Sequence, residues 1–133
     1  MKKNIPFGFL IIFFVVIHFG CNNGISDEYY VRYTVDSSPL DSDPKLNIVY
    51  TNEDSNSTNV IITVGTDWQI IIGPVKKGFN TELKVSRETA IPDRITCAIW
   101  INVSENGGLF YMKKGVVGTT SLGTPFHIKY TID

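Results

Sequence analysis

The sequence predicts an all-β fold over residues 29–133, an antiparallel β-sandwich of about eight short strands with immunoglobulin-like topology. Three observations predict this fold class. Apolar and polar residues alternate with period two through most of the region, turn-forming residues interrupt the alternation at regular intervals, and no apolar stripe of helical period is present. A closed barrel with the same alternation is the alternative.

The alternating runs are the predicted strands, and the apolar residues of each run share one face. In chain order, the runs cover residues 29–36, 46–51, 60–64, 67–72, 79–87, 95–103, 108–114 and 126–133. The inward positions include Tyr29, Val31, Tyr33, Val35, Leu46, Ile48, Tyr50, Val60, Ile62, Val64, Trp68, Ile70, Ile72, Leu83, Val85, Ile95, Cys97, Ile99, Ile101, Val103, Phe126, Ile128, Tyr130 and Ile132. Such alternation is typical of strands that bury one face.

The segments between the runs carry the residues that favour turns and loops. They are the polar turn at 52–59, the tight connection at 65–66, a break at 73–74, a turn at 77–78, a loop at 88–94 and a connection at 115–125. Asn106-Gly107 is the strongest hairpin signal, because both residues tolerate the positive φ of a type I′ turn. The run at 95–103 is the most regular, and we expect it to be a central strand.

The first residues have the layout of a secretory signal peptide. Lys2 and Lys3 precede an almost unbroken apolar stretch, residues 5–19, which ends at Gly20 and Cys21. A small residue followed by cysteine resembles a bacterial lipoprotein cleavage site. We therefore expect a signal peptide over residues 1–20 and lipidation of Cys21.

Two other interpretations of this segment are a retained transmembrane anchor and an ordinary secretory signal. A membrane-spanning helix needs about 20 apolar residues, whereas about 15 are available here, interrupted by Pro6 and Gly8. His18 and Phe19 stand where lipoprotein sites usually have an aliphatic and a small residue. Such a loosened site resembles those of Bacteroidetes lipoproteins.

Residues 21–28 are expected to form the lipidated cysteine and a short tether. The segment is small and polar, and its Ser26–Glu28 end resembles the acidic export signal of some surface lipoproteins; a plain linker is the alternative. The predicted location is the bacterial cell envelope, as an outer membrane lipoprotein on the periplasmic or the surface face. The partner implied is the membrane itself, through the lipid anchor.

The charge of the chain argues against a nucleic-acid partner, and its cysteine content limits the possible disulfide bonds. Removal of Lys2 and Lys3 with the signal leaves ten basic residues against thirteen acidic ones, so a nucleic-acid partner is not expected. With Cys21 lipidated, Cys97 has no partner for a disulfide. Its alternation within a strand predicts a buried, packing side chain.

No constellation of residues points to catalysis, a metal or a cofactor, and we do not expect an enzyme. Asp36, Asp41 and Asp43 bracket one loop but lack the glycine and distal glutamate of a calcium-binding hand, which favours solvated carboxylates. His127 is expected to face outward beside Lys129 as a surface histidine. The only candidate site residue besides Cys21 is Trp100.

Trp100 is a possible partner-binding residue because the alternation that buries Ile99 and Ile101 turns it to the opposite face. If that face is open, an exposed tryptophan is a candidate contact. The competing interpretation is that the following hairpin covers it, through Phe110 or Met112.

The order of features resembles the MmpS family, small envelope partners of mycobacterial exporters. The matching segments are an opening YTV, then NIVYTN, TDWQIII, ITCAIWINV and a closing FHIKYTID. The resemblance implies a sandwich domain and a non-enzymatic accessory role at an envelope. The closing strand here lacks the family's partner cysteine, and a lipid would replace the family's anchoring helix.

The function expected from the sequence is a lipid-anchored binding or adaptor module of the cell envelope, with an envelope protein as possible partner. Two alternatives from other classes stay open. One is a small envelope hydrolase or a ligand-carrying β-barrel, and the other is a structural subunit of a surface fibre.

Overall fold

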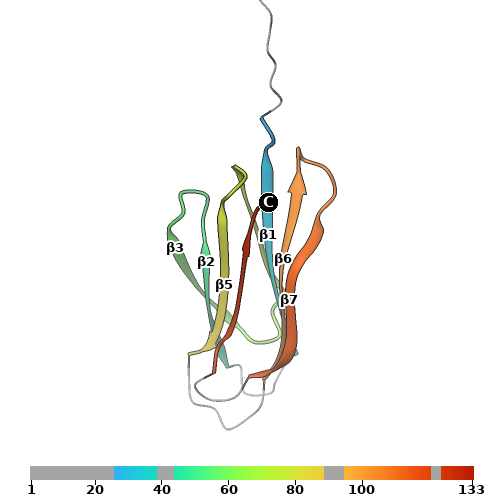
Figure 1. Ribbon diagram of the computed structural model, residues 1–133. Coiled ribbons are helices and arrows are strands. Elements are labelled where there is room, and N and C mark those ends of the chain that lie inside the picture. Colours follow the sequence, from blue (N-terminus) through green and yellow to red (C-terminus); the bar gives the residue numbers. More distant parts are fainter. Residues whose placement is uncertain (1–25, 39–43, 89–94, 121–123) are drawn as a thin grey trace, which may run out of the picture.

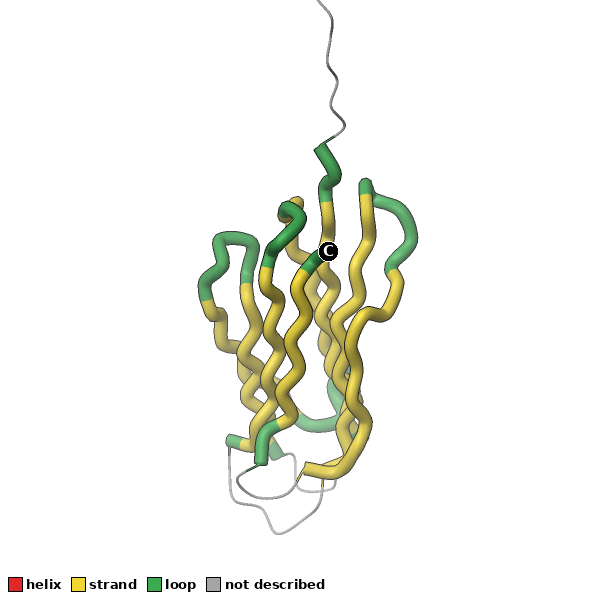
Figure 2. The backbone as a smooth tube through the Cα atoms, in the orientation of Figure 1, coloured by secondary structure: helices red, strands yellow, loops and turns green. Residues whose placement is uncertain are grey.

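The computed structural model describes residues 26–38, 44–88, 95–120 and 124–133. These residues form eight strands and no helix (Figures 1 and 2). The strands are β1 (Tyr29–Ser37), β2 (Lys45–Thr51), β3 (Ser57–Thr63), β4 (Trp68–Val75), β5 (Asn80–Arg87), β6 (Ile95–Glu105), β7 (Tyr111–Thr120) and β8 (Phe126–Thr131). The all-β prediction is confirmed.

The strands build two separate four-stranded sheets that pack face to face. The first sheet has the order β4-β1-β6-β7 and the second the order β3-β2-β5-β8. Every neighbouring pair is antiparallel. We name them sheet A and sheet B; the arrangement is the predicted β-sandwich, not a closed barrel.

The strand order follows an immunoglobulin-type Greek key with one difference. In that topology, strands E, B and A share one sheet, while C′, C, F and G share the other. Here β4 and β1 take the places of E and B, and β3, β2, β5 and β8 take those of C′, C, F and G. The difference is the β6–β7 pair, which lies between β5 and β8 in the chain: β6 takes the place of A beside β1, and β7 extends the sheet beyond it.

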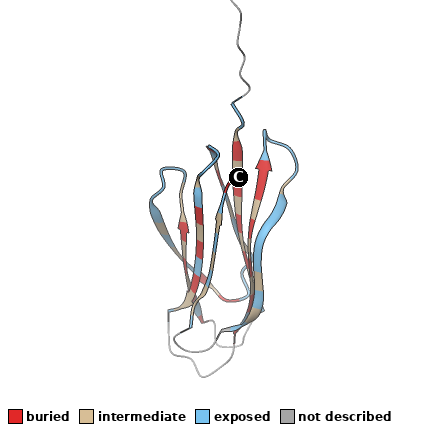
Figure 3. Cartoon of the chain, in the orientation of Figure 1, coloured by how far each residue is buried: buried red, intermediate tan, exposed pale blue. Residues whose placement is uncertain are grey.

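The core lies between the sheets and consists of the predicted inward faces. Alternate residues of β1, β2, β5 and β6 are buried (Figure 3). Tyr33 is fully buried, and its hydroxyl donates a hydrogen bond to the Thr51 carbonyl at 2.9 Å. Its ring lies 5.5 Å from that of Tyr50, which lies 5.5 Å from that of Trp68. This aromatic row joins both sheets.

The predicted hairpin and the central strand are both confirmed. Asn106 and Gly107 have φ values of 51° and 72°, and the Gly108 amide donates to the Glu105 carbonyl at 3.0 Å. These are the features of a type I′ turn. β6 is paired on both edges, by β1 and β7.

Three segments predicted to be connections belong partly to strands, so the prediction of a turn or loop is wrong for those residues. β3 begins at Ser57, inside the polar turn expected over 52–59. β4 continues through Gly73-Pro74, where an irregularity in its pairing with β1 absorbs an extra residue. β7 extends to Thr120, through much of the connection expected over 115–125. All three segments lie on edge strands, where proline and polar residues are tolerated.

The end of the sandwich at which β1 begins also holds the β6–β7 turn and residue 133 (Figure 1). Glu28, the last residue of the expected tether, is fixed there: its carbonyl accepts from the Asn106 amide at 2.7 Å, and its amide donates to Asn106 Oδ1 at 3.1 Å. The expected signal peptide and Cys21 lie outside the described residues. The part of the chain that is described has no helix with the length and apolar character to span a bilayer.

Candidate functional site

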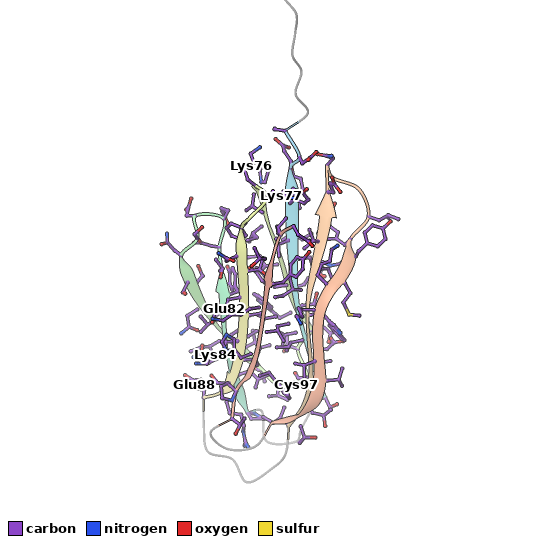
Figure 4. All side chains as sticks on the ribbon, viewed as in Figure 1. Lys76, Lys77, Glu82, Lys84, Glu88 and Cys97 are labelled. Atoms are coloured by element: carbon purple, nitrogen blue, oxygen red, sulfur yellow. The ribbon has the colours of Figure 1, made fainter. Side chains whose placement is uncertain are left out.

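The outward faces of the two sheets differ in chemistry. The outward face of sheet B carries charged and polar side chains on its central and edge strands, among them Glu82, Lys84, His127, Lys129 and Thr131. Figure 4 shows Glu82 and Lys84 along β5. Ile61 on β3 is its one large hydrophobic side chain with more than half of its surface exposed among the described residues. This face is therefore a solvated surface.

His127 faces outward, as predicted, and contacts a carboxylate. Its Nε2 lies 2.5 Å from Glu82 Oε1, and Lys129 Nζ lies 3.5 Å from the same oxygen. Partial burial raises the pKa of Glu82, but the hydrogen bond from His127 and the charge of Lys129 outweigh it, so the pKa is lowered overall. Cys97 is 1% exposed in the core, whereas His127 is on the outward face, so the thiol and the imidazole do not form a catalytic pair.

The outward face of sheet A carries Trp100 at its centre. In the register of the sheet, Trp100 stands beside Thr34 of β1 on one side and Gly115 of β7 on the other. One row further along, Met112 pairs with Asn102, and in the opposite direction Val117 pairs with Ala98. Because side chains alternate along each strand, these residues share the outward face with Trp100.

Trp100 is half-buried because it lies across a glycine. A Cβ on Gly115 would stand 2.5 Å from Trp100 Cδ1, 3.1 Å from its Nε1 and 3.3 Å from Met112 Sδ. The indole therefore fills the space that the missing side chain leaves. Met112 lies next to the same point, so Trp100 is neither fully exposed nor fully covered by the following hairpin.

Large, solvent-exposed hydrophobic side chains lie on the same face of the sheet as Trp100. Ile71 on β4, Met112 and Val117 on β7 have exposed fractions of 52%, 64% and 67%. Together with Trp100 they form the patch that we call the sheet A face. The other residues of that face are small or polar, and Arg32 and Thr34 of β1 stand between the strand of Ile71 and that of Trp100.

An arginine anchors the loop at the margin of the sheet A face. The guanidinium carbon of Arg32 lies 4.7 Å from the centroid of the Phe110 ring, a cation–π geometry. Arg32 Nε is buried and has no hydrogen-bond partner among the residues that the structure describes. The contact joins the middle of β1 to the segment between β6 and β7, and thus holds Phe110 next to Met112.

Two carboxyl groups meet at the far end of the same face. Asp36 on β1 shares a hydrogen bond with Asp67, and this bond, followed by burial and the charge of Asp67, raises the pKa of Asp36. Asp41 and Asp43 lie outside the described residues. No group of three or more metal-ligating side chains occurs in the described part of the chain.

Sequence reasoning found Trp100 but missed what holds it in place. Gly115 was predicted to lie in a connection, whereas a glycine inside a strand often marks a close approach by another group. The partners of Arg32 and the Asp36–Asp67 pair depend on strand neighbours that are distant in sequence. Alternation alone does not specify those neighbours.

Comparison with known proteins gives no relative on which to base a function. A scan against protein-family models found no match, and a search of curated proteins found none either, so the chain is not assigned to a family.

Proposed function

We propose that the protein is a lipid-anchored binding module of a bacterial cell envelope. In this proposal Cys21 carries the lipid, and the sheet A face contacts an envelope protein. The basic, apolar and Gly-Cys order of residues 1–21 supports the anchor. The apolar residues exposed around Trp100 support the contact.

The observation that carries the proposal is the chemical contrast between the two sheets. One outward face places Trp100, Met112, Ile71 and Val117 together, while the other is charged and polar. Tryptophan, methionine and arginine are enriched at protein interfaces, and exposed apolar clusters mark interaction sites on soluble domains. A nucleic-acid ligand would instead favour a basic surface.

The position of the face fits an anchor that leaves from the start of β1. The sheet A face runs along the length of the sandwich, from Met112 to Val117, rather than across one end. A domain tethered through residues before Tyr29 thus presents this face sideways to the membrane. Another protein in the same layer of the envelope can then reach it.

The anchor is tested by replacing Cys21 with serine and labelling growing cells with a radioactive fatty acid. The wild-type chain should take up label, and the Cys21→Ser variant should not. Equal label in both chains would exclude lipidation at Cys21 and leave the sheet A face to be tested separately.

The contact is tested by crosslinking in native membranes, with substitutions on the two outward faces compared. Val117→Lys and Met112→Lys place a charge on the sheet A face, and Ile61→Lys places the same charge on the outward face of sheet B. We expect the first two to lower recovery of a specific crosslinked protein about tenfold or more and the third to leave it unchanged. Equal recovery from all three variants would contradict the assignment, and crosslinks only between copies of the chain would favour the fibre-subunit alternative.

A further inference from the structure

A hollow lies between the two sheets at the end where β1 begins. Its volume is about 340 Å³, within the range of small-molecule sites. Three tyrosines and three charged residues line most of it: Tyr29, Glu105, Tyr111, Lys113, Tyr130 and Asp133. These residues come from β1, β6, β7 and β8 and from the chain beyond β8. The hollow is separate from the sheet A face, because it opens between the sheets.

Aromatic rings form the walls, and one of them ends in a free polar group. Tyr29 is only 7% exposed, yet its hydroxyl has no hydrogen-bond partner in the described part of the chain. The hydroxyl of Tyr130, in contrast, donates to Asp133 Oδ1. The Tyr29 hydroxyl therefore offers an acceptor and a donor to a molecule in the hollow.

The charges around the hollow favour a cation. Burial and then the charges of Glu105, Asp27 and Asp133 raise the pKa of Tyr29, so three carboxylates act on its hydroxyl. The hydrogen bond from Tyr130 lowers the pKa of Asp133, and the charges of Lys113 and Lys77 lower it further. Of the charged side chains that line the hollow, Glu105 and Asp133 are carboxylates and Lys113 is an ammonium group, so negative charge exceeds positive charge there.

This ammonium group already lies on an aromatic wall. Lys113 Nζ is 6.0 Å from the centroid of the Tyr130 ring, the outer limit of a cation–π contact. Lys113 is an exposed residue of β7, at the position where the pairing of β6 and β7 is irregular. Its long side chain can therefore move away without loss of core packing.

We propose that this hollow binds the primary ammonium group of a small ligand, and that Lys113 competes with the ligand for the face of Tyr130. The ligand nitrogen would donate to Tyr29 and to the carboxylate of Glu105. A quaternary ammonium has no N–H to donate, and an anion would meet more negative than positive charge. The proposal goes beyond the adaptor role and depends neither on Cys21 nor on the sheet A face.

Two sources can supply this chemistry, a free amine and the headgroup of an ethanolamine lipid. The probes are ethanolamine, glycerophosphoethanolamine and glycerophosphocholine, titrated into the full chain in detergent and followed by calorimetry. Saturable binding of both amines with equal affinity points to a free amine. Tighter binding of glycerophosphoethanolamine points to a lipid headgroup, and glycerophosphocholine should bind more weakly than either amine.

Charge-changing variants test whether the ligand in the hollow is a cation or an anion. Lys113→Gln should tighten ethanolamine binding about two- to fivefold, because the internal competitor is gone, and Glu105→Gln should weaken it by a similar factor. Lys114→Gln and Glu53→Gln make the same changes at residues outside the hollow and should have no effect. Tyr130→Leu should weaken binding about fivefold, with circular dichroism as the check that the variant folds.

Two results would overturn the proposal. The first is the absence of saturable binding of either amine to the folded wild-type chain. The second is weaker ethanolamine binding in Lys113→Gln, which would show that the lysine assists the ligand and that the hollow favours an anion.

Discussion

Replacing Gly115 with alanine tests the packing beneath Trp100. The new Cβ would stand 2.5 Å from Trp100 Cδ1, whereas carbon atoms in contact are normally about 3.5–4.0 Å apart. The overlap is thus about 1 Å, and the indole is a rigid ring that Met112 confines on one side. Either Trp100 or β7 must move.

The magnitude follows from two opposing effects. Overpacking of a side chain costs about 1–3 kcal/mol, whereas exchange of glycine for alanine stabilises by about 0.4–1 kcal/mol through the unfolded chain. The net expectation is a loss of about 1–2 kcal/mol in the free energy of unfolding. For a domain of this size, that lowers Tm by about 4–10 °C.

The assay is urea unfolding followed by circular dichroism, with Gly118→Ala as the matched control. Gly118 lies in the same strand, but a Cβ there would meet only the Phe126 ring at 3.5 Å, an ordinary contact. The control should therefore be neutral or stabilising. In a Trp100→Ala background, Gly115→Ala should lose most of its cost, since the clash has gone. Equal stability of the two glycine variants in the wild-type background would refute the described packing.

Three further predictions concern the core and its margin. Tyr33→Phe should lower the free energy of unfolding by about 1 kcal/mol, because the Thr51 carbonyl loses the hydroxyl donor, and an unchanged urea midpoint would contradict the contact. Burial raises the pKa of the Cys97 thiol to about 11, so in a Cys21→Ser variant a thiol reagent at pH 8 should label Cys97 only as the protein unfolds; labelling of the native protein at the rate of an exposed thiol would be the opposite result. Asp67→Asn should raise Tm at pH 7 and have little effect near pH 3. Because the folded pKa of Asp36 is raised, the hydrogen bond between protonated Asp36 and Asp67 stabilises the fold fully below the unfolded pKa of 3.8, and this stabilisation is lost as pH rises through the folded pKa. A gain in Tm that does not depend on pH would contradict the pair.

The fold could be predicted from the sequence because its main signal is local. Alternation at Tyr29, Val31, Tyr33 and Val35 reports a buried face wherever the strand lies, and the structure buries all four. Likewise, Asn106-Gly107 carries its turn geometry in its own backbone preferences.

Strand partners could not be predicted in the same way, because pairing is a long-range property. Nothing in residues 95–105 indicates that β6 lies beside β1 rather than beside β5, its neighbour in sequence. The error at Gly115 and Gly118 has the same origin. The sequence of those glycines is typical of a connection, yet both are paired residues of β7, and Trp100 occupies the side-chain space at Gly115.

The sequence could predict that Trp100 faces outward, but not which residues lie around it on the surface. Alternation placed Trp100 opposite Ile99 and Ile101, which the structure supports. Its neighbours Ile71, Met112 and Val117 come from two other strands, so their assembly follows only from the sheet order. The hollow at Tyr29 is likewise lined by strands from both sheets, so it could not be predicted from any single segment of the sequence.

The position of β1 has a mechanical consequence. β1 is hydrogen-bonded on both edges, to β4 and to β6, and Glu28 is held by Asn106 just before it. A pull on the chain ahead of Tyr29 therefore acts along a central strand and loads both rows of hydrogen bonds in shear, all at once. An edge strand pulled from its end would instead unzip one bond after another. The domain is thus built to resist force at the point where a surface tether would apply it.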